Sequence, residues 1–276
     1  MSIARYKGVA TAQSSIAHGA QALGTITYLR RERFLLPNNQ QEDIPVISGN
    51  AWRGILRDTA ADLWLEKVGS PKMPLAVVHA LWSGGALAKV AGPTLTGSRL
   101  ASLRKAVPVI GLFGAAGGGR IIDGCLQVGK MIPICQETKH IVPEEFHYEN
   151  LPSLWDVTQI ESYSRNSLIP KSALLQDESS GDSFDPMRFG VETFIAGTKF
   201  YTWINLSHPT QDEHNFFLET MESYLLAPRV GGLAGTGHGS LLFDFPQLHQ
   251  EIKELVNWQI HDNDKEVLGG ILAWLN

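Results

Sequence analysis

The amino-acid sequence predicts an α+β fold with a βαββαβ-like core, and three observations support this. Helical periodicity occurs at 51–67 and 214–227, and β-rich segments precede and follow each of these stretches. Once two less regular stretches are set aside, the order is strand, helix, strand, strand, helix, strand. The chain has 276 residues, of which 43% are hydrophobic and 18% charged, as in ordinary globular proteins. We therefore expect one domain over 1–276, with insertions at about 70–110 and 136–188.

The first part of the chain alternates short β-rich segments with turns. Residues 5–13 predict the first strand, and Ser14 to Gly24, rich in small residues, predicts a loop. Residues 25–36 are β-rich at both ends. Asn50 is placed to cap a helix that begins at Ala51, because its side chain can accept the free N–H groups there. One face of that helix carries the apolar set Trp52, Ile55, Leu56, Leu63 and Trp64.

The second part contains the two less regular stretches. Residues 70–110 predict short helices broken by Gly and Pro, and 120–134 alternate as a strand does. Residues 136–190 are polar and rich in turn formers, and a stretch of this kind is usually functional. The segment FGVETFIAGTKFYTWINL (189–206) predicts a hairpin that turns at Ala196–Gly197. A strand at 240–245 and a helical tail at 247–276 complete the chain.

Charge and cysteine usage limit the functional classes. The net charge of −5 disfavours a lysine-coated, non-specific nucleic-acid binder, although a local arginine groove remains compatible with it. No apolar run approaches the length of about 18 residues that predicts a membrane span, and the N-terminus lacks a signal-peptide pattern. Cys125 and Cys135 match no metal-binding pattern and are expected to be buried thiols in a reducing cytoplasm. We expect no membrane association, no cofactor and no metal.

A glycine-rich segment, VGGLAGTGHGSLLF (230–243), could bring backbone N–H groups close to a phosphate. Nucleotide-binding loops of the Walker and dinucleotide types run from a strand through the loop into a helix. Here the order is reversed, and no Lys-Ser/Thr pair follows the glycines. A nucleotide cofactor is therefore disfavoured. A tight turn from helix to strand stays open as an alternative, although one glycine would suffice for such a turn.

Four segments together resemble the RAMP superfamily, the repeat-associated proteins of CRISPR systems. IPVISGNAWRGILRD (44–58) resembles its "P-x-I-x-G-S/N-x-x-R/K-G-x-L-R" signature, and APRVGGLAGTGHGSLLF (227–243) resembles its C-terminal glycine-rich loop. LFGAAGGGRIIDGCLQV (112–128) resembles an "FG…G…" strand entry, and residues 189–206 resemble an "E-x-x-x-x-G-T/A-x-F" segment. The four matches keep the order that the family shows.

Within the superfamily the chain is most similar to the backbone subunit of CRISPR effector complexes. LRRERFLLPNNQQEDIPVISGN (29–50) resembles the type IV branch, with the type III backbone subunit second. The resemblance implies a modified RRM/ferredoxin-like core, helical "fingers" at about 70–110 and a β-hairpin "thumb" within 136–188. It also implies several copies along one guide RNA, contacts with other effector subunits, and target nucleic acid paired to the guide.

The expected RNA-binding residues combine arginines, a helix start and the glycine loop. Arginines, polar side chains and free N–H groups suit a sugar-phosphate backbone that is held regardless of sequence. By resemblance, the glycine loop packs beside the start of the helix. The candidates are Arg30, Arg31, Arg33, Ser48, Gly49, Asn50, Arg53, Arg57, Arg229, Gly231, Gly232, Gly235, Gly237 and His238.

Each candidate also has a structural interpretation. Arg53 or Arg57 could pair with Asp58 or Glu66 at the surface, and Arg30, Arg31 and Arg33 could form a solvated strand face with Glu32. His238 could be a hydrogen-bonding loop residue without chemistry, and Trp52 and Trp64 fit a helix core rather than base stacking.

The chain is expected not to be an enzyme. Type III backbone subunits, by resemblance, cut target RNA with an aspartate in the loop after the first strand and use a metal. Ser14 to Gln41 contains no aspartate, and its only acid is Glu32. The alternative is a RAMP-family endoribonuclease that uses His18 as general acid or base, for which no Tyr or Lys partner is obvious. A third class is a phosphosugar or nucleotide binder, for which a thermal shift with a nucleotide and none with RNA is the expected sign.

Overall fold

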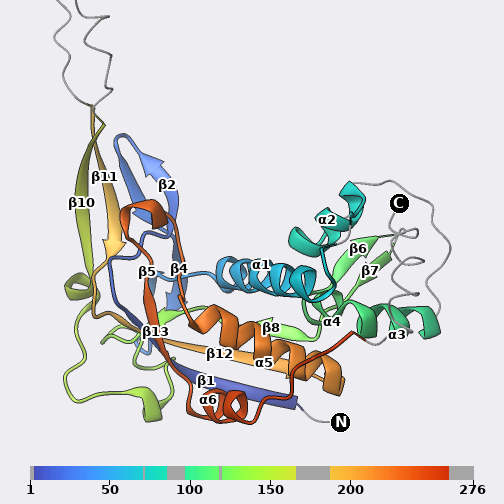
Figure 1. The fold of residues 1–276 in the computed structure, drawn as a ribbon. Helices are drawn as coiled ribbons and strands as arrows, with labels where there is room; N and C mark the ends of the chain where they lie inside the picture. Colours follow the sequence, from blue (N-terminus) through green and yellow to red (C-terminus); the bar gives the residue numbers. More distant parts are fainter. Residues whose placement is uncertain (1–2, 71, 86–96, 118–119, 166–186, 261–276) are drawn as a thin grey trace, which may run out of the picture.

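The computed structural model describes residues 3–70, 72–85, 97–117, 120–165 and 187–260, and it has a mixed α+β architecture (Figure 1). A central antiparallel sheet has the strand order β13-β1-β12-β8, and β9 pairs with the other end of β12. These strands are β1 (Ile3–Ala12), β8 (Leu126–Val128), β9 (Ile132–Pro133), β12 (Lys199–Ser207) and β13 (Leu241–Asp244). The α+β prediction is confirmed.

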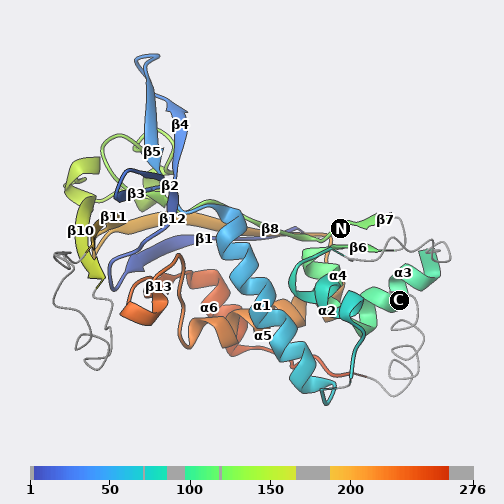
Figure 2. The ribbon, with the colours of Figure 1, turned by 90° about the horizontal axis from the view of Figure 1, so that it is seen from above.

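Three helices lie on the same side of this sheet (Figure 2). They are α1 (Gly49–Lys67), α5 (Gln211–Leu225) and α6 (Pro246–Lys253). The chain passes through β1, α1, β8 and β9, β12, α5 and β13 in that order, so the two strand-helix-strand units predicted from periodicity build the central layer.

Capping residues define where α1 and α5 begin. The Ser48 hydroxyl accepts the N–H of Ala51 at 3.2 Å, so Ser48 is the N-cap of α1. The prediction that Asn50 caps this helix is therefore wrong, because the helix starts one residue earlier and Asn50 lies inside its first turn. In α5, Thr210 and Glu213 form a reciprocal capping box that satisfies two N–H groups.

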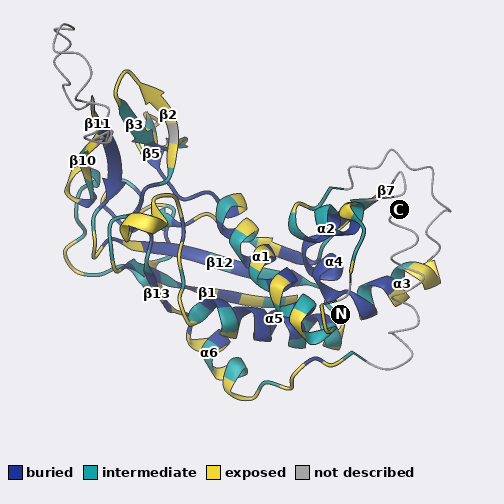
Figure 3. Ribbon diagram, turned by 45° about the horizontal axis from the view of Figure 1, so that its top comes forward, coloured by how far each residue is buried: buried dark blue, intermediate teal, exposed yellow. Residues whose placement is uncertain are grey.

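The core lies between the helices and the sheet, where the ribbon is coloured as buried in Figure 3. Trp52 and Trp64 are completely buried, which confirms the prediction that they are core residues. Trp52 stacks on Phe243 of β13 with ring centroids 5.4 Å apart, and so ties α1 to the edge of the sheet. Burying a side chain of this size stabilises the fold by about 1.5–3 kcal/mol.

A second, four-stranded sheet has the order β10-β11-β3-β2. Its strands are β2 (Gly19–Leu23), β3 (Ile26–Leu29), β10 (Thr158–Arg165) and β11 (Met187–Phe194). The loop predicted from Ser14 to Gly24 therefore contains a strand. Strands β10 and β11 are antiparallel and project away from the central sheet (Figure 1).

The predicted hairpin at 189–206 is wrong, although both of its strands exist. β11 pairs with β10 and β3, whereas β12 pairs with β1, β8 and β9. Between them the chain turns from one sheet into the other. Gly197 adopts φ 90° and donates its N–H to the carbonyl of Ala12, while Ile195 donates to the carbonyl of Val157. These two bonds direct the strands to different partners.

A two-stranded ribbon, β4 (Arg31–Leu35) with β5 (Gln41–Pro45), extends from the side of the sheet opposite the helices (Figure 2). The stretch at 70–110 contains α2 (Leu75–Trp82), α3 (Gly97–Ala106) and the start of α4 (Pro108–Phe113), and β6 (Ala115–Gly117) and β7 (Arg120–Ile122) follow it. This helical part lies at the end of the molecule opposite to β10 and β11 in both ribbon views. The single strand predicted at 120–134 is instead divided into β7, β8 and β9; Gly124, between β7 and β8, packs directly against the backbone of Leu112, and Met131, between β8 and β9, pairs with Ile47.

Short 3-10 helices complete the described chain, at Glu144–Phe146, Leu154–Val157 and Ala234–Thr236 (η1, η2 and η3). Cys125 and Cys135 are buried and unpaired, as predicted, and burial raises the pKa of their thiols to about 12 and about 11. Parts of the predicted fingers (86–96), thumb (166–186) and helical tail (261–276) lie outside the described residues. No helix within the described ranges is long and apolar enough to cross a membrane.

Candidate nucleic-acid interface

Three segments that carry predicted site residues meet at Ala17 and His18, in the loop after β1. The N–H of Ser48 donates to Nε2 of His18 at 3.2 Å, and the N–H of Arg30 donates to the carbonyl of His18 at 2.8 Å. The N–H of Gly232 donates to the carbonyl of Ala17 at 2.7 Å. The start of α1, Arg30 and the glycine loop are therefore gathered around one short loop. Its small residues predicted only a loop, so the role of Ala17 and His18 in joining these segments was missed.

The His18 imidazole serves this arrangement as an acceptor. Burial and the nearby charge of Arg30 lower its pKa, which favours the neutral ring that can accept an N–H bond. At the helix start, Ser48 is 8% exposed, and a Cβ on Gly49 would lie 2.5 Å from the carbonyl oxygen of Val128. Of Ser48, Gly49 and Asn50, only Asn50 is exposed.

The three arginines after β3 have different surroundings. Arg31 forms a bidentate ion pair with Glu192 of β11, and Arg33 pairs with Asp43 of β5 at 2.9 Å. Glu32, between them, pairs with Lys130. Arg30 is exposed, and in the part of the chain that the structure describes its side chain has no hydrogen bond or ion pair. Arg30 is thus the arginine of this group whose guanidinium is available to a phosphate.

Arg57 is a structural residue in this arrangement. It is 7% exposed, and its guanidinium donates to the carbonyls of Leu81 at 2.6 Å, Ala80 at 2.9 Å and Gly114 at 2.5 Å. Burial lowers its pKa to about 10. These carbonyls belong to the C-terminal ends of α2 and α4, so Arg57 caps two helices and holds them against α1. Its expected exposure to RNA is contradicted by this burial, because α2 and α4 cover it.

Arg53 lies one turn earlier on α1 and is half-buried. Its Nη2 donates to the carbonyl of Phe113 at 2.7 Å, and its guanidinium carbon lies 5.4 Å from the centroid of the Phe113 ring. Neither Arg53 nor Arg57 forms an ion pair with Asp58 or Glu66, so the surface-bridge interpretation of this pair is also wrong within the described chain. Arg53 and Arg57 face α2 and α4 instead.

The glycines of the 230–239 loop allow close backbone packing. Gly231 has φ 81° and Gly239 has φ 87°, and a Cβ at either position would overlap a neighbouring carbonyl oxygen, that of Ala17 or of Val230. The N–H of Gly239 donates to the carbonyl of Ser15 at 2.8 Å, and that of Gly237 to Ala234 at 3.0 Å. Several N–H groups that could have met a phosphate are therefore used by the protein. Residues 231–237 remain exposed as a surface.

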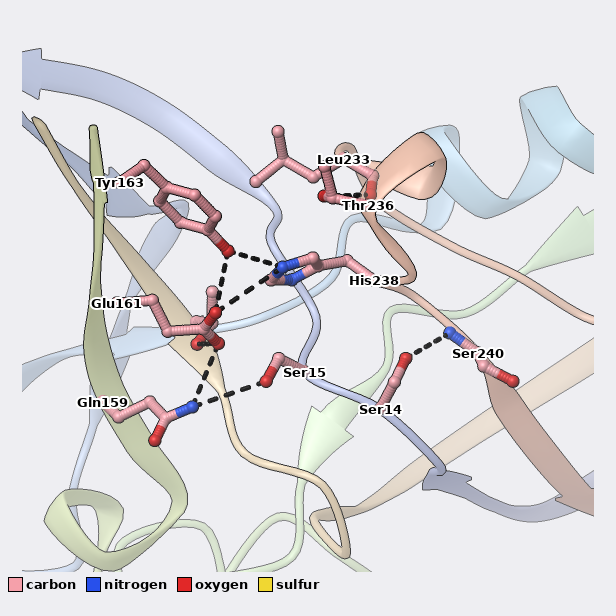
Figure 4. A network of polar contacts seen from close by, with 10 residues as sticks. Ser14, Ser15, Gln159, Glu161, Tyr163, Leu233, Thr236, His238 and Ser240 are labelled. Carbon is pink, nitrogen blue, oxygen red and sulfur yellow. Dashed lines mark hydrogen bonds and ion pairs between the residues drawn. The ribbon is translucent and has the colours of Figure 1, made fainter. Parts of the chain in front are cut away.

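Arg229 and His238 frame this loop. Nη1 of the exposed Arg229 lies 3.5 Å from the carbonyl oxygens of Ala234 and His238, which are within weak hydrogen-bonding distance. His238 is 6% exposed, and its Nε2 lies 2.6 Å from the hydroxyl of Tyr163 on β10 (Figure 4). His238 is therefore a buried hydrogen-bonding residue of the loop, in agreement with the interpretation that gives it no chemistry.

No family model and no curated protein matches this sequence. Among solved structures, the chain is similar to a chain of a structure described as "Type IV-B CRISPR Complex", with a TM-score of 0.61 and 27% sequence identity. The match covers 87% of this chain and 90% of the other. This similarity supports the interpretation of the protein as a subunit of a CRISPR complex.

Proposed function

We propose that this protein is the backbone subunit of a CRISPR effector complex, and that several copies hold one guide RNA by its sugar-phosphate backbone. The similarity to the type IV-B complex chain over 87% of this sequence carries the proposal. The strand order β13-β1-β12-β8, connected through α1 and α5, supports the modified RRM/ferredoxin-like core of the RAMP superfamily.

The proposed RNA surface is smaller than the set of residues expected from sequence. It consists of Arg30, Asn50 at the start of α1, and the exposed arm of the glycine loop with Arg229. Arg30 supplies a charge, and the first turn of α1 supplies free N–H groups and the positive end of the helix dipole. Such contacts recognise phosphate and sugar without regard to base, as a subunit that carries many different guides requires.

Self-association is part of this proposal. With a net charge of −5 and few exposed arginines on the proposed surface, we propose that the path of the RNA runs across neighbouring copies. The β10–β11 strands and the helical part around α2 and α3 lie at opposite ends of the molecule (Figure 1). Contacts between unlike ends that do not close into a ring generate open filaments, and such a filament suits a long single strand.

Reconstitution with guide RNA tests the proposal. Purified protein is mixed with guide RNA of increasing length, and the mass of the complex is measured by light scattering. The proposal predicts stepwise growth with RNA length and equal affinity for unrelated sequences. A protein that stays monomeric and binds no RNA at modest salt would refute it.

The same reagents test the proposal that the subunit is non-catalytic. The loop after β1 contains no aspartate, and His18 has its Nε2 engaged by the N–H of Ser48. We expect repeat RNA to stay intact with and without magnesium. Specific cleavage that disappears in His18→Ala would establish the endoribonuclease alternative instead.

A further inference from the structure

A polar network joins β10 and β11 to the glycine loop (Figure 4). On β10, the Tyr163 hydroxyl lies 2.6 Å from Nε2 of His238, and Oε2 of Glu161 lies 3.5 Å from the same nitrogen. In the part of the chain that the structure describes, the hydrogen bonds and ion pairs between this strand pair and the glycine loop run through His238.

The direction of proton donation in the network is defined by the tyrosine. Its hydroxyl has one proton, which it donates to Oε2 of Glu161 at 2.7 Å. Nε2 of His238 must therefore carry a proton and donate it to the tyrosine oxygen. The contact consequently needs a donor at position 238 and a hydroxyl at position 163.

The partners of His238 are held rigidly. The Glu161 carboxylate also accepts from Thr193 of β11 at 2.9 Å and from Gln159 of β10 at 3.0 Å. The Tyr163 ring stacks on Phe189 of β11, with centroids 5.7 Å apart. The tyrosine can therefore not turn away from His238 without losing this stacking.

We infer that Tyr163 and His238 are positioning residues that set the orientation of the β10–β11 strand pair relative to the glycine loop. Backbone bonds attach the loop to Ser15 and Ala17 in the loop after β1, whereas its direct contacts with β10 are the side-chain contacts of His238. The further consequence rests on the proposed function: the glycine loop belongs to the proposed RNA surface and the β10–β11 pair lies beside it, so the Tyr163–His238 contact affects the length of RNA that one copy covers.

A distance measurement without RNA tests whether the Tyr163–His238 contact sets this orientation. Spin labels are attached at Ser164→Cys on β10 and Gly235→Cys in the loop, both exposed positions; the two native thiols are buried. We expect one narrow distance in the otherwise unchanged protein. Tyr163→Phe keeps the stacked ring and removes the hydroxyl, and we expect the narrow distance to be lost. An unchanged narrow distance in Tyr163→Phe would overturn the inference.

Two variants of His238 separate positioning from general stability. His238→Gln retains an N–H donor on a side chain of similar reach and should keep the narrow distance, whereas His238→Leu should lose it. Thermal melting of each variant identifies any that fail to fold, in which case the glutamine variant decides. If the glutamine variant folds but its distribution of spin-label distances is as broad as that of the leucine variant, the hydrogen-bond explanation is contradicted.

The consequence for RNA is measured by titrating homopolymeric RNA of increasing length. Tyr163→Phe and His238→Leu should cover a different length of RNA per copy than the starting protein and His238→Gln. The same length in all four proteins would overturn this part of the inference. If the starting protein binds no RNA, the proposed function fails. The distance measurements still test the positioning role of Tyr163 and His238.

Discussion

Arg31 and Glu192 form a bidentate ion pair that joins two separate sheets. Nη1 of Arg31, at the start of β4, donates to Oε2 of Glu192 at 2.8 Å, and Nη2 donates to Oε1 at 2.5 Å. The Glu192 side chain is only 9% exposed and also accepts the N–H of Leu29 at 2.9 Å. One buried carboxylate thus fixes the end of β3, the start of β4 and the middle of β11.

Replacing Arg31 should therefore destabilise the fold. Arg31→Ala leaves the buried carboxylate of Glu192 without its cation, and we expect the free energy of unfolding to fall by about 1–3 kcal/mol. Urea denaturation measures this change. The matched control is Arg33→Ala, whose ion pair with Asp43 is exposed and should contribute little. Equal losses in the two variants would contradict this assignment.

Arg57 should matter for stability and not directly for RNA. Arg57→Met keeps much of the volume and removes the donors to Leu81, Ala80 and Gly114. Because buried carbonyls then lose a charged donor, we expect a loss of about 3 kcal/mol in the free energy of unfolding. The salt dependence of RNA binding, measured on the folded variant, should stay the same. A shallower slope of log affinity against log salt concentration would indicate a direct phosphate contact.

Arg30 should show the opposite behaviour. Arg30→Ala removes an exposed cation without a described side-chain partner, so thermal stability should not change. If Arg30 contacts a phosphate, the slope of log affinity against log salt should become shallower by about 0.7, as expected for single-stranded nucleic acid. Fluorescence anisotropy over a range of salt concentrations measures it. A loss of affinity confined to one RNA sequence would argue against backbone recognition.

Two glycines of the same loop should respond differently to alanine. Gly239 has φ 87°, and its Cβ would overlap the carbonyl oxygen of Val230, so Gly239→Ala should cost about 1–3 kcal/mol. Gly235 has no left-handed φ, and a Cβ there meets nothing within 4 Å. Gly235→Ala should therefore be tolerated. Chemical denaturation compares the two, and equal effects would show that the loop is not held as described.

The stability provided by Glu161 should depend on pH. Burial disfavours its charged form, but hydrogen bonds from Ser15, Tyr163, Thr193 and Gln159 outweigh this and lower the pKa from 4.5 to about 2. A lowered pKa means that the stabilisation is complete above the ordinary value and is lost as the pH falls toward 2. Glu161→Gln should be less stable than the starting protein at neutral pH, and the difference should shrink between pH 4.5 and 2. A difference in stability that stays constant over this pH range would contradict the lowered pKa of Glu161.

Periodicity predicted most of the central layer because its elements bury one face locally. The apolar stripe of 51–67 and the amphipathic pattern of 214–227 became α1 and α5 with small changes at their ends. Strand pairing was less accessible. The two β-rich runs in 189–206 looked like a hairpin, but Gly197 sends them into different sheets, and this depends on Ala12 and Val157, which are remote in sequence.

The candidate site was predicted only in part, for a similar reason. Arg53 and Arg57 share a helical face, and sequence could not show that α2 and α4 would cover that face. The glycine loop and the start of α1 were recognised as belonging together by resemblance. The loop at Ala17 and His18 that joins them has no distinctive composition, since it acts through backbone groups and one imidazole.

The sequence by itself determined the two long helices and the order of the elements around them, the aromatic core of α1 and the absence of an aspartate between Ser14 and Gln41. These properties depend on local periodicity and on the identity of residues. Only the tertiary structure decided which arginines face solvent, because a guanidinium becomes buried when folding supplies enough carbonyl or carboxylate partners for it. Arg57 became buried in this way, Arg31 stays at the surface but pairs with the buried Glu192, and Arg30 has no such partner in the described chain.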